Sequence, residues 1–536
     1  MDLSRATIMC FASLLLELGL QDKVVELFAQ YSPLQRGLGM PPQLVKFSVE
    51  PGSRRRLFLY NPLAQERTEH VQFLVTEPNI AVEDASGQRL LVQLEPQGKA
   101  FLAHFLVRLL PLSIHVFSVI GVRSEGEVAP PAAIARTDAD LGDAFTISNA
   151  RFQLSFNKTG FLWSVRDRRV NRELPLAISF GAFATVERES GLYLFAAKDQ
   201  PPRRLPCAGR RWAVREDAVS SEASVDCGRV RLTVRLLHTD APPGQAVHLE
   251  TETRLSRDDD ETDVFMHLRT GVASCAARGC GFFADANDYQ MVWRPYVPAA
   301  GVAGNVYPVT TQASLQDHRL RLSLLMDHSR GVASLKEGTL TAMLDRRSRF
   351  DDDRGIGQGN QANRPVRASF LVTFEHLPEP PASDELFANG PLTRRSPASQ
   401  LNHPPQLLDG ALPCDWELVT LRQLPERHRY EYPGRRLQLT LLRRRLRCRP
   451  AATPGVEFSP FISLESVEPV GLTGGERPAP AEPLRGLRDL RLEPDELRTF
   501  ELSYRRPGLD SVEEMDEEEV HFVKELNGVG SKEAVR

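Results

Sequence analysis

The chain is poor in cysteine and contains no long uninterrupted apolar run. Its 536 residues include 7 cysteines and no C-x-x-C pair, so neither a zinc knuckle nor a thioredoxin-type redox site is predicted. The stretch 6–20 is too short to cross a membrane, and the stretch 100–122 is interrupted by histidine and arginine, so no membrane span is predicted. Asp2 stands where a secretory signal carries positive charge, and the sequence alone predicts no targeting route.

An excess of one charge sign is missing as well. The 66 basic and 70 acidic side chains leave a net charge of -4, which argues against nucleic acid as a partner. Hydrophobic residues make up 41% and charged residues 25%, a balance typical of folded globular chains rather than of disordered ones.

The spacing of apolar residues changes once along the chain. Helical spacing occurs at the start, at Ile8, Phe11, Leu15 and Leu18. It predicts a short helical segment over residues 1–44. From there on apolar and polar residues alternate, as in 152–156, 230–236 and 437–441, which places one face in a core and the other in water. With 39 prolines and 36 glycines mainly between such runs, the sequence predicts a mainly β protein built of consecutive antiparallel β-sandwich domains.

Proline-rich stretches predict where these domains end. Two of them are interpreted as linkers, over residues 125–142 and 378–410. The predicted units are a helical segment 1–44, a small β-sandwich 45–124, a large β-sandwich 143–377, a C-terminal β domain 411–505 and an acidic tail 506–536.

A self-contained active site is not evident. The nearest set of metal-ligating types is His238-Thr239-Asp240 together with His248, on either side of a proline-rich hairpin loop. Further ligands are missing, so we interpret it as a polar turn with histidines at the ends of two strands. No nucleophile elbow, phosphate-binding loop or dinucleotide fingerprint occurs in a matching context.

One acidic loop differs from an ordinary solvated turn. Residues 351–359 read Asp-Asp-Asp-Arg-Gly-Ile-Gly-Gln-Gly and follow a predicted strand that contains Asp345-Arg346-Arg347. The three glycines permit positive φ angles and a close approach of backbones. The carboxylates and the arginine could then form a fixed polar network.

At this loop the sequence resembles the class II α-mannosidases, glycoside hydrolase family thirty-eight, and within it the Golgi-type branch. That family has an Asp-Asp-x-Arg-Gly loop soon after an Asp-Arg-Arg strand. The likeness covers residues 45–505 and corresponds to the C-terminal β half of the family only. Further segments match in the same order: 60–63 (YNPL), 191–195 (GLYLF), 285–290 (DANDYQ), 305–308 (NVYP), 331–335 (GVASL) and 412–415 (LPCD).

The resemblance implies retaining hydrolysis of α-mannosides, with N-glycans as substrates, in the Golgi lumen. In the family, the zinc ligands and the nucleophilic aspartate belong to a separate α/β domain with a His-x-Asp-Pro-Gly-Trp motif. Because that motif is absent here, we expect no catalytic residue, no metal ligand and no bound zinc in this chain, and no activity of this chain alone. The missing catalytic domain would be its partner, encoded by the same gene or by a separate chain.

The resemblance also implies particular site residues. Carried over position by position, Tyr193, Asp351, Asp352 and Arg354 would contact the substrate or position the groups that do. For Asp351 and Asp352 the alternative is a network that packs one domain against the next.

The cysteines and one glycosylation sequon suit a lumenal location. The resemblance implies a disulfide between Cys414 and Cys448 in the last β domain, and Cys275 with Cys280 could close a short loop. Asn157 begins the sequon.

Two main readings remain open. The chain could be the C-terminal portion of a Golgi-type α-mannosidase, which supplies the wall of the sugar-binding cleft. It could instead be a non-catalytic carbohydrate-binding or scaffolding β module. A split enzyme, with the zinc domain on another chain, is a third alternative.

Overall fold

The computed structural model describes residues 46–61, 63–123, 134–137, 144–157, 161–198, 200–205, 212–276, 279–287, 290–361, 364–377, 408, 410–413, 415–424, 436–443, 463–472, 490, 492–493 and 496–505. The predicted helical segment 1–44, the acidic tail 506–536, and the pair Cys414 and Cys448 lie outside these residues, as does nearly all of the linker 378–410. Within the described part the chain is mainly β, as the sequence predicts. No helix there is long and apolar enough to span a membrane.

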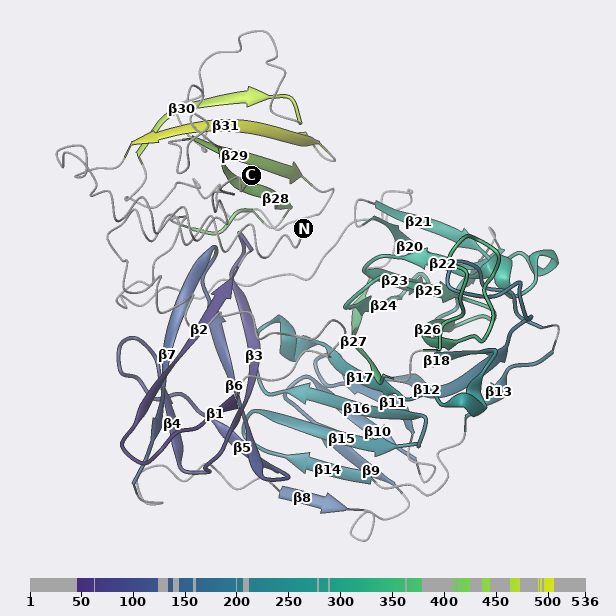
Figure 1. Cartoon of the computed structure of the whole chain (residues 1–536), viewed down its shortest axis with the longest axis horizontal. Helices are drawn as coiled ribbons and strands as arrows, with labels where there is room; N and C mark the ends of the chain where they lie inside the picture. Colours follow the sequence, from purple (N-terminus) through teal and green to yellow (C-terminus); the bar gives the residue numbers. More distant parts are fainter. Residues whose placement is uncertain are drawn as a thin grey trace, which may run out of the picture.

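The first sandwich consists of two small sheets (Figure 1). One has the order β1 (Lys46–Phe47), β3 (Arg67–Val75), β6 (Ala100–Leu109) and β5 (Gln93–Gln97), and the other the order β2 (Arg54–Asn61), β7 (Ser113–Gly121) and β4 (Ile80–Glu83). Only β1 and β3 are parallel among these pairs of described strands. Phe73, Phe105 and Phe117 belong to the buried cluster that joins the two sheets.

The large sandwich consists of two long antiparallel sheets. The first has the order β22 (Tyr307–Val309), β25 (Arg330–Ala333), β26 (Thr339–Arg347), β18 (Thr262–Thr270), β12 (Arg172–Ala184), β11 (Leu162–Asp167), β10 (Phe152–Phe156) and β9 (Phe145–Ser148), and β13 (Arg203–Arg204) pairs with β12. The second has the order β19 (Cys275–Ala276), β20 (Gly279–Ala286), β23 (Gln312–Gln316), β24 (Leu320–Met326), β27 (Val366–His376), β17 (Val247–Thr253), β16 (Val230–Leu237), β15 (Ser220–Asp226), β14 (Trp212–Glu216) and β8 (Ile134–Thr137), and β21 (Gln290–Pro295) pairs with β20. Short 3-10 helices interrupt the loops: η1 (Pro242–Gln245), η2 (Arg257–Asp259), η3 (Pro298–Ala300) and η4 (Ala303–Asn305).

One hydrophobic core lies between these two long sheets. In β16 the alternating residues Val230, Leu232, Val234 and Leu236 are all buried to 1% exposure or less. They belong to the same cluster as the apolar residues of β10 in the opposite sheet. The period-two pattern therefore places one face of each strand in a shared core, as predicted.

Part of the segment predicted as a linker forms a strand instead. Ile134–Thr137 pairs antiparallel with β14 and forms the edge of the second long sheet. Prolines 130 and 131 precede this strand and indicated a linker, but a proline before a strand does not prevent pairing beyond it.

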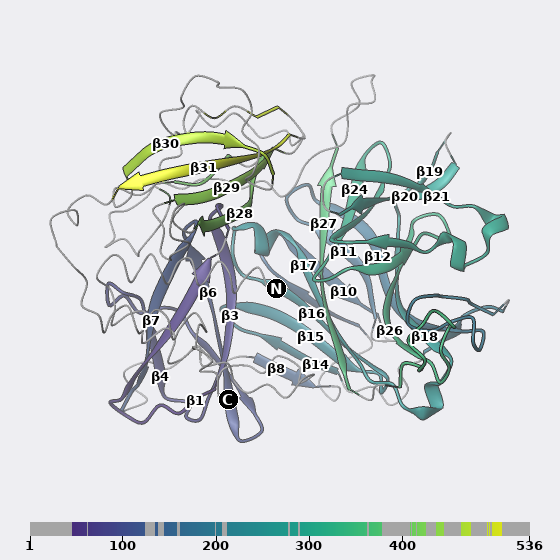
Figure 2. The same cartoon turned by 45° about the horizontal axis from the view of Figure 1, so that its top comes forward.

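The last sheet has the order β28 (Trp416–Leu424), β29 (Arg436–Arg443), β31 (Leu497–Arg505) and β30 (Ser463–Val470). It lies against the end of the first sandwich in both views (Figures 1 and 2). Ala64, Leu112 and Ile114 of the first sandwich belong to the same buried cluster as Leu439 and Phe500 of this sheet. Sequence positions more than 300 residues apart thus share one core.

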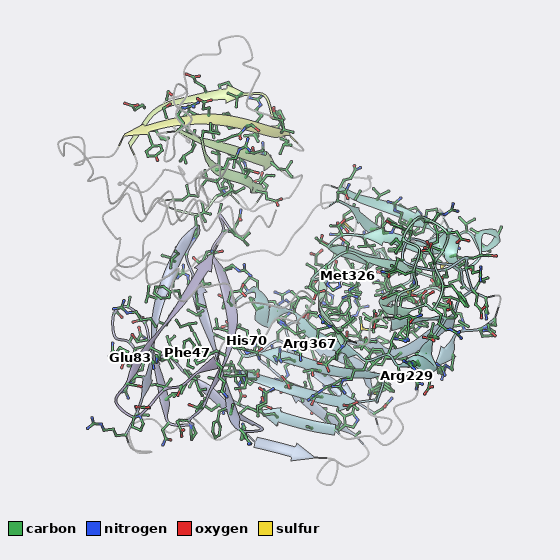
Figure 3. The ribbon with its side chains drawn as sticks, in the orientation of Figure 1. Phe47, His70, Glu83, Arg229, Met326 and Arg367 are labelled. Atoms are coloured by element: carbon green, nitrogen blue, oxygen red, sulfur yellow. A yellow bond between two sulfur atoms is a disulfide. The ribbon has the colours of Figure 1, made fainter. Side chains whose placement is uncertain are left out.

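The first and large sandwiches meet through buried polar groups. His70 of β3 lies on the side of the first sandwich that faces the large one (Figure 3), and its Nε2 is 3.1 Å from Nδ1 of His104. Nε2 of His104 is 3.3 Å from Oδ2 of Asp217, and both side chains are fully buried. Arg235 of β16 forms ion pairs with Glu222 at 2.8 Å and with Glu250 at 2.6 Å and is only 7% exposed.

The burial of Arg235 corrects one expectation. The alternation in 230–236 predicts that the arginine face of this strand is exposed to water. At Arg235 that prediction is wrong, because ion pairs to two glutamates satisfy its guanidinium and let the residue be buried.

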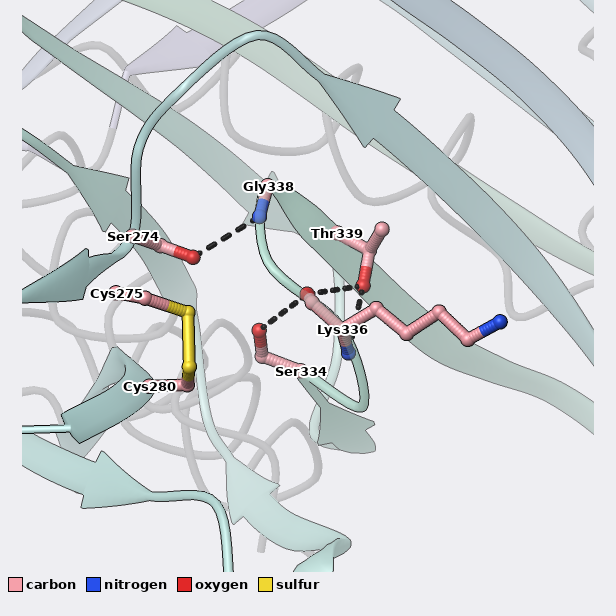
Figure 4. Close-up of a disulfide and its surroundings, with 7 residues drawn as sticks. All are labelled: Ser274, Cys275, Cys280, Ser334, Lys336, Gly338 and Thr339. Carbon is pink, nitrogen blue, oxygen red and sulfur yellow. Dashed lines mark hydrogen bonds between the residues drawn. A yellow bond between two sulfur atoms is a disulfide. The ribbon is translucent and has the colours of Figure 1, made fainter.

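A disulfide joins Cys275 and Cys280, which lie opposite each other in β19 and β20 (Figure 4). The neighbouring Ser274 hydroxyl accepts a hydrogen bond of 3.0 Å from the backbone N–H of Gly338. The short loop that the sequence allowed is therefore closed. Cys227 is also disulfide-bonded.

Candidate functional site

The acidic loop follows β26 directly and folds back on that strand. The side-chain amide of Asn360 donates a hydrogen bond of 2.7 Å to the backbone oxygen of Arg346. The backbone N–H of Ser348 donates a hydrogen bond of 3.0 Å to the backbone oxygen of Asn360. Gly355 and Gly357 have φ angles of 102° and 74°, so the glycine spacing has the conformational role that the sequence predicts. Hydrogen bonds thus fix the conformation of this loop against the end of β26.

Asp352 connects this loop to a distant turn of residues 191–194. Its Oδ2 accepts hydrogen bonds from the backbone N–H groups of Tyr193 at 2.7 Å and Leu194 at 2.8 Å. Burial opposes ionisation of the carboxyl group, but these hydrogen bonds outweigh it and hold the pKa of Asp352 below its usual value. The side chain is therefore a carboxylate at neutral pH, buried to 3% exposure.

The turn leaves no room for a side chain at Gly191. A Cβ atom there would lie 2.8 Å from both the Cγ and the backbone nitrogen of Asp352. This contact explains why glycine begins the Gly-Leu-Tyr-Leu-Phe segment.

We expect Gly191→Ala to separate the turn from Asp352. The clash with backbone cannot be relieved by rotating a side chain, so the protein should lose about 1–3 kcal/mol of unfolding free energy in chemical denaturation. Gly87→Ala provides a surface comparison, since no atom lies within 4 Å of a Cβ there, although its φ of +84° carries its own strain. Equal stability of wild type and Gly191→Ala would contradict the close contact.

Arg346 contacts the opposite side of the same turn. One of its terminal nitrogens, Nη1, donates to the backbone oxygen of Leu194 at 2.7 Å and also to that of Gly191. Its Nε donates 2.7 Å to Oδ1 of Asp263, the residue directly opposite on β18. Burial raises the pKa of Asp263, while the Arg346 guanidinium acts in the opposite direction.

A cavity of about 480 Å³ lies between the loop and the turn. It is lined by Arg188, Glu189, Leu194, Phe195, Ala196, Asp352, Asp353 and Arg354. Oδ1 of Asp351 and Oδ1 of Asp352 are both buried, and the backbone N–H of Arg354 helps to hold the Asp352 carboxylate. Of these two carboxylates, that of Asp352 lines the cavity.

The structure brings together the residues that the sequence singled out. Asp352 and Arg354 line the cavity, and Tyr193 precedes the cavity-lining Leu194 with its side chain 65% exposed. Asp351 fixes the loop, since its Oδ2 accepts 3.1 Å from the backbone N–H of Gly357. Their contact with a substrate stays a prediction.

Sequence reasoning missed Arg346, Asp263 and Arg188. The Asp345-Arg346-Arg347 motif is visible in the sequence, but the alternation of apolar and polar residues does not indicate which residue on the next strand pairs with Arg346. Arg188 lies over the ring of Phe350 at 5.3 Å, a contact between residues 162 positions apart that no local pattern indicates.

Zinc does not fit the part of the chain that the structure describes. No group of three or more histidine, cysteine, aspartate or glutamate side chains there could hold a metal ion. Nε2 of His238 is 3.0 Å from the hydroxyl of Ser221, and Nε2 of His248 is 2.7 Å from the backbone oxygen of Pro243. His238 thus pairs with a serine of β15, and His248 of β17 pairs with the short helix η1.

Residues 147–354 match the family described as the glycosyl hydrolases family 38 C-terminal domain. Alpha-mannosidase 2 of Spodoptera frugiperda is 26% identical over 552 residues, which cover 87% of this chain and 48% of that protein. Alpha-mannosidase 2 of Mus musculus is 25% identical, with 87% of this chain and 45% of that protein covered. The chain therefore spans less than half the length of these relatives.

A similar fold occurs in solved structures. An alpha-mannosidase from Enterococcus faecalis V583 superposes with a TM-score of 0.53 over 90% of this chain and 58% of that chain, at 13% identity. A protein in the glycosyl hydrolase family 38 from Enterococcus faecalis gives the same TM-score over 85% of this chain. At such identity the likeness concerns the fold.

Proposed function

We propose that the large sandwich of this chain, whose residues 147–354 match the glycosyl hydrolases family 38 C-terminal domain, supplies the wall of a mannoside-binding cleft in an α-mannosidase. The matched residues 147–354 include both the turn 191–194 and the acidic loop as far as Arg354. The substrate class is then an N-glycan or another α-mannoside, with the Golgi lumen as the proposed location. The disulfide between Cys275 and Cys280 supports an oxidising compartment.

The cavity beside Asp352 carries this proposal. A sugar hydroxyl needs an acceptor, and the Asp352 carboxylate on the cavity wall is held in a fixed position by the N–H groups of Tyr193 and Leu194. Arg354 adds donors on the same wall, and the exposed ring of Tyr193 adds an apolar face with a polar tip. Fixed acceptors, donors and an aromatic ring are the groups that a polar, partly apolar ring such as a hexose can contact.

These residues bind and orient; they do not supply the chemistry. Retaining hydrolysis needs a nucleophilic carboxylate and a proton donor about 5 Å apart on either side of the scissile bond. In our proposal those groups, and zinc, come from the catalytic domain of the complete enzyme. The described residues offer no zinc ligands, and we derive no step through the metal.

Binding of α-mannobiose to the chain tests the proposal. We expect a saturable isotherm in titration calorimetry, and an affinity about tenfold weaker for Arg354→Gln because a charged hydrogen bond is lost. Arg367→Gln is the matched control, since Arg367 is an exposed arginine of β27 paired with Glu252. Equal affinity of both variants, or equal binding of maltose, would exclude a mannoside-specific wall at this cavity.

A further inference from the structure

The turn 191–194 is held in place by polar groups rather than by burial. Its three bulky residues remain exposed: Leu192 by 43%, Tyr193 by 65% and Leu194 by 38%. Apolar side chains this exposed contribute little packing energy to fix a loop. Its order must come from the hydrogen bonds of its backbone.

Those hydrogen bonds come from opposite charges on opposite sides. The carboxylate of Asp352 binds the N–H groups of Tyr193 and Leu194, and the guanidinium of Arg346 binds the carbonyl oxygens of Gly191 and Leu194. Leu194 alone is thus held through its N–H by an anion and through its carbonyl by a cation. Hydrogen bonds to charged groups are stronger than those between neutral groups.

Arg346 is itself fixed in the sheet. Its Nε binds the carboxylate of Asp263, whose side chain is 3% exposed, and its guanidinium lies 5.6 Å from the ring centre of Phe195. That ring packs edge-on against Phe183 at 5.9 Å. The guanidinium therefore connects the rigid pair β18 and β26 to the exposed turn.

Only a guanidinium meets this geometry. Nε and Nη1 are separate donors in one plane, so Arg346 reaches the carboxylate behind it and two carbonyl oxygens in front of it at once. A lysine ammonium donates from a single point and could serve one side only.

We infer that Arg346, supported by Asp263, is a positioning residue that holds the turn 191–194 and thereby presents Tyr193 to the ligand of the adjacent cavity. The inference rests on the proposed function for the identity of that ligand, a mannoside. The ordering of the turn does not depend on it.

Hydrogen–deuterium exchange of the peptide 190–195 tests the ordering. We expect Arg346→Gln to raise its exchange rate about tenfold, the loss expected for hydrogen bonds to a charged group. Arg347→Gln is the matched control, because Arg347 is the next residue of β26, is 3% exposed, and binds Asp260 and the backbone oxygen of Gln361 instead of the turn. Unchanged exchange in Arg346→Gln, or an equal rise in both variants, would overturn the inference.

Arg346→Lys keeps the experiment decisive if the glutamine variant fails to fold. The lysine ammonium keeps the positive charge opposite Asp263 but cannot bind both carbonyl oxygens of the turn. The exchange rate of the peptide 190–195 should therefore lie between that of wild type and that of a turn with no bond to residue 346. Wild-type exchange in Arg346→Lys would overturn the argument from guanidinium geometry.

The affinity for α-mannobiose separates this inference from the proposed function. Weaker binding in Arg346→Gln, with β26 peptides still protected, supports a positioning role; unchanged binding despite a loosened turn contradicts it. If the wild-type chain binds no mannobiose, the proposed function fails, whereas the exchange experiment still decides whether Arg346 orders Tyr193.

Discussion

Phe156→Ala should lower the unfolding free energy of the large sandwich by about 4 kcal/mol, the range found for removing a buried aromatic ring. The Phe156 side chain is fully buried in the core between the two long sheets. Its ring stacks on Phe145 with centres 4.6 Å apart and lies edge-on to Trp212 at 5.5 Å. Three aromatic rings thus form one contact set, and the removed ring leaves a cavity that rigid sheets cannot close.

Equilibrium urea unfolding measures this loss. Trp163→Ala is the comparison, because Trp163 is an even larger aromatic residue on the neighbouring strand β11 but is 52% exposed. It should change the unfolding free energy by no more than about 0.5 kcal/mol. Similar losses in both variants would mean that Phe156 is not part of a tightly packed core.

Acidification from pH 7 to pH 5 should cost about 2 kcal/mol of stability through His70 alone. Burial, with the positive charge of Arg235 and the neighbouring His104, lowers the pKa of His70 from 6.5 to about 2. The unfolded chain therefore takes up a proton below pH 6.5 that the folded chain refuses. Stability from this group is complete above pH 6.5 and falls by about 1.4 kcal/mol per pH unit as the pH drops toward 2.

The difference between wild type and His70→Gln isolates this contribution. Urea unfolding at pH 7 and pH 5 should show a smaller acid loss in the variant, by about 2 kcal/mol. His318→Gln, which replaces an exposed histidine, should keep the wild-type loss. The same acid loss in wild type and His70→Gln would show that His70 is protonated in the folded protein.

The strands could be predicted from sequence because each depends on its own residues. Val230 to Leu236 alternate, and the same four apolar side chains lie in the core of β16. What lies on the outer face of a strand is not encoded locally. Arg235 is buried because two glutamates on the neighbouring strands pair with it, and a period-two pattern contains no information about that pairing.

The candidate site likewise has one part that the sequence predicts and another that only the fold reveals. The acidic loop stood out because carboxylates, an arginine and three glycines occupy nine consecutive positions. Its hydrogen bond from the backbone N–H of Tyr193 to Asp352 joins residues 159 positions apart, so it could be found only from the fold. Asp263 could not be found from sequence for a further reason: its partner Arg346 lies opposite it on the neighbouring strand β26, and only the register of the two strands defines that pair.

The core that Ala64, Leu112 and Ile114 share with the last sheet affects how the molecule can be divided. Leu412 donates its backbone N–H to the oxygen of Ala64 at 3.0 Å, and the Gln65 side chain donates 2.6 Å to the oxygen of Trp416. A recombinant fragment that stopped at His376 would leave these apolar side chains facing solvent and invite aggregation. A fragment that avoids this exposure should therefore keep the first sandwich together with the last sheet, or omit both.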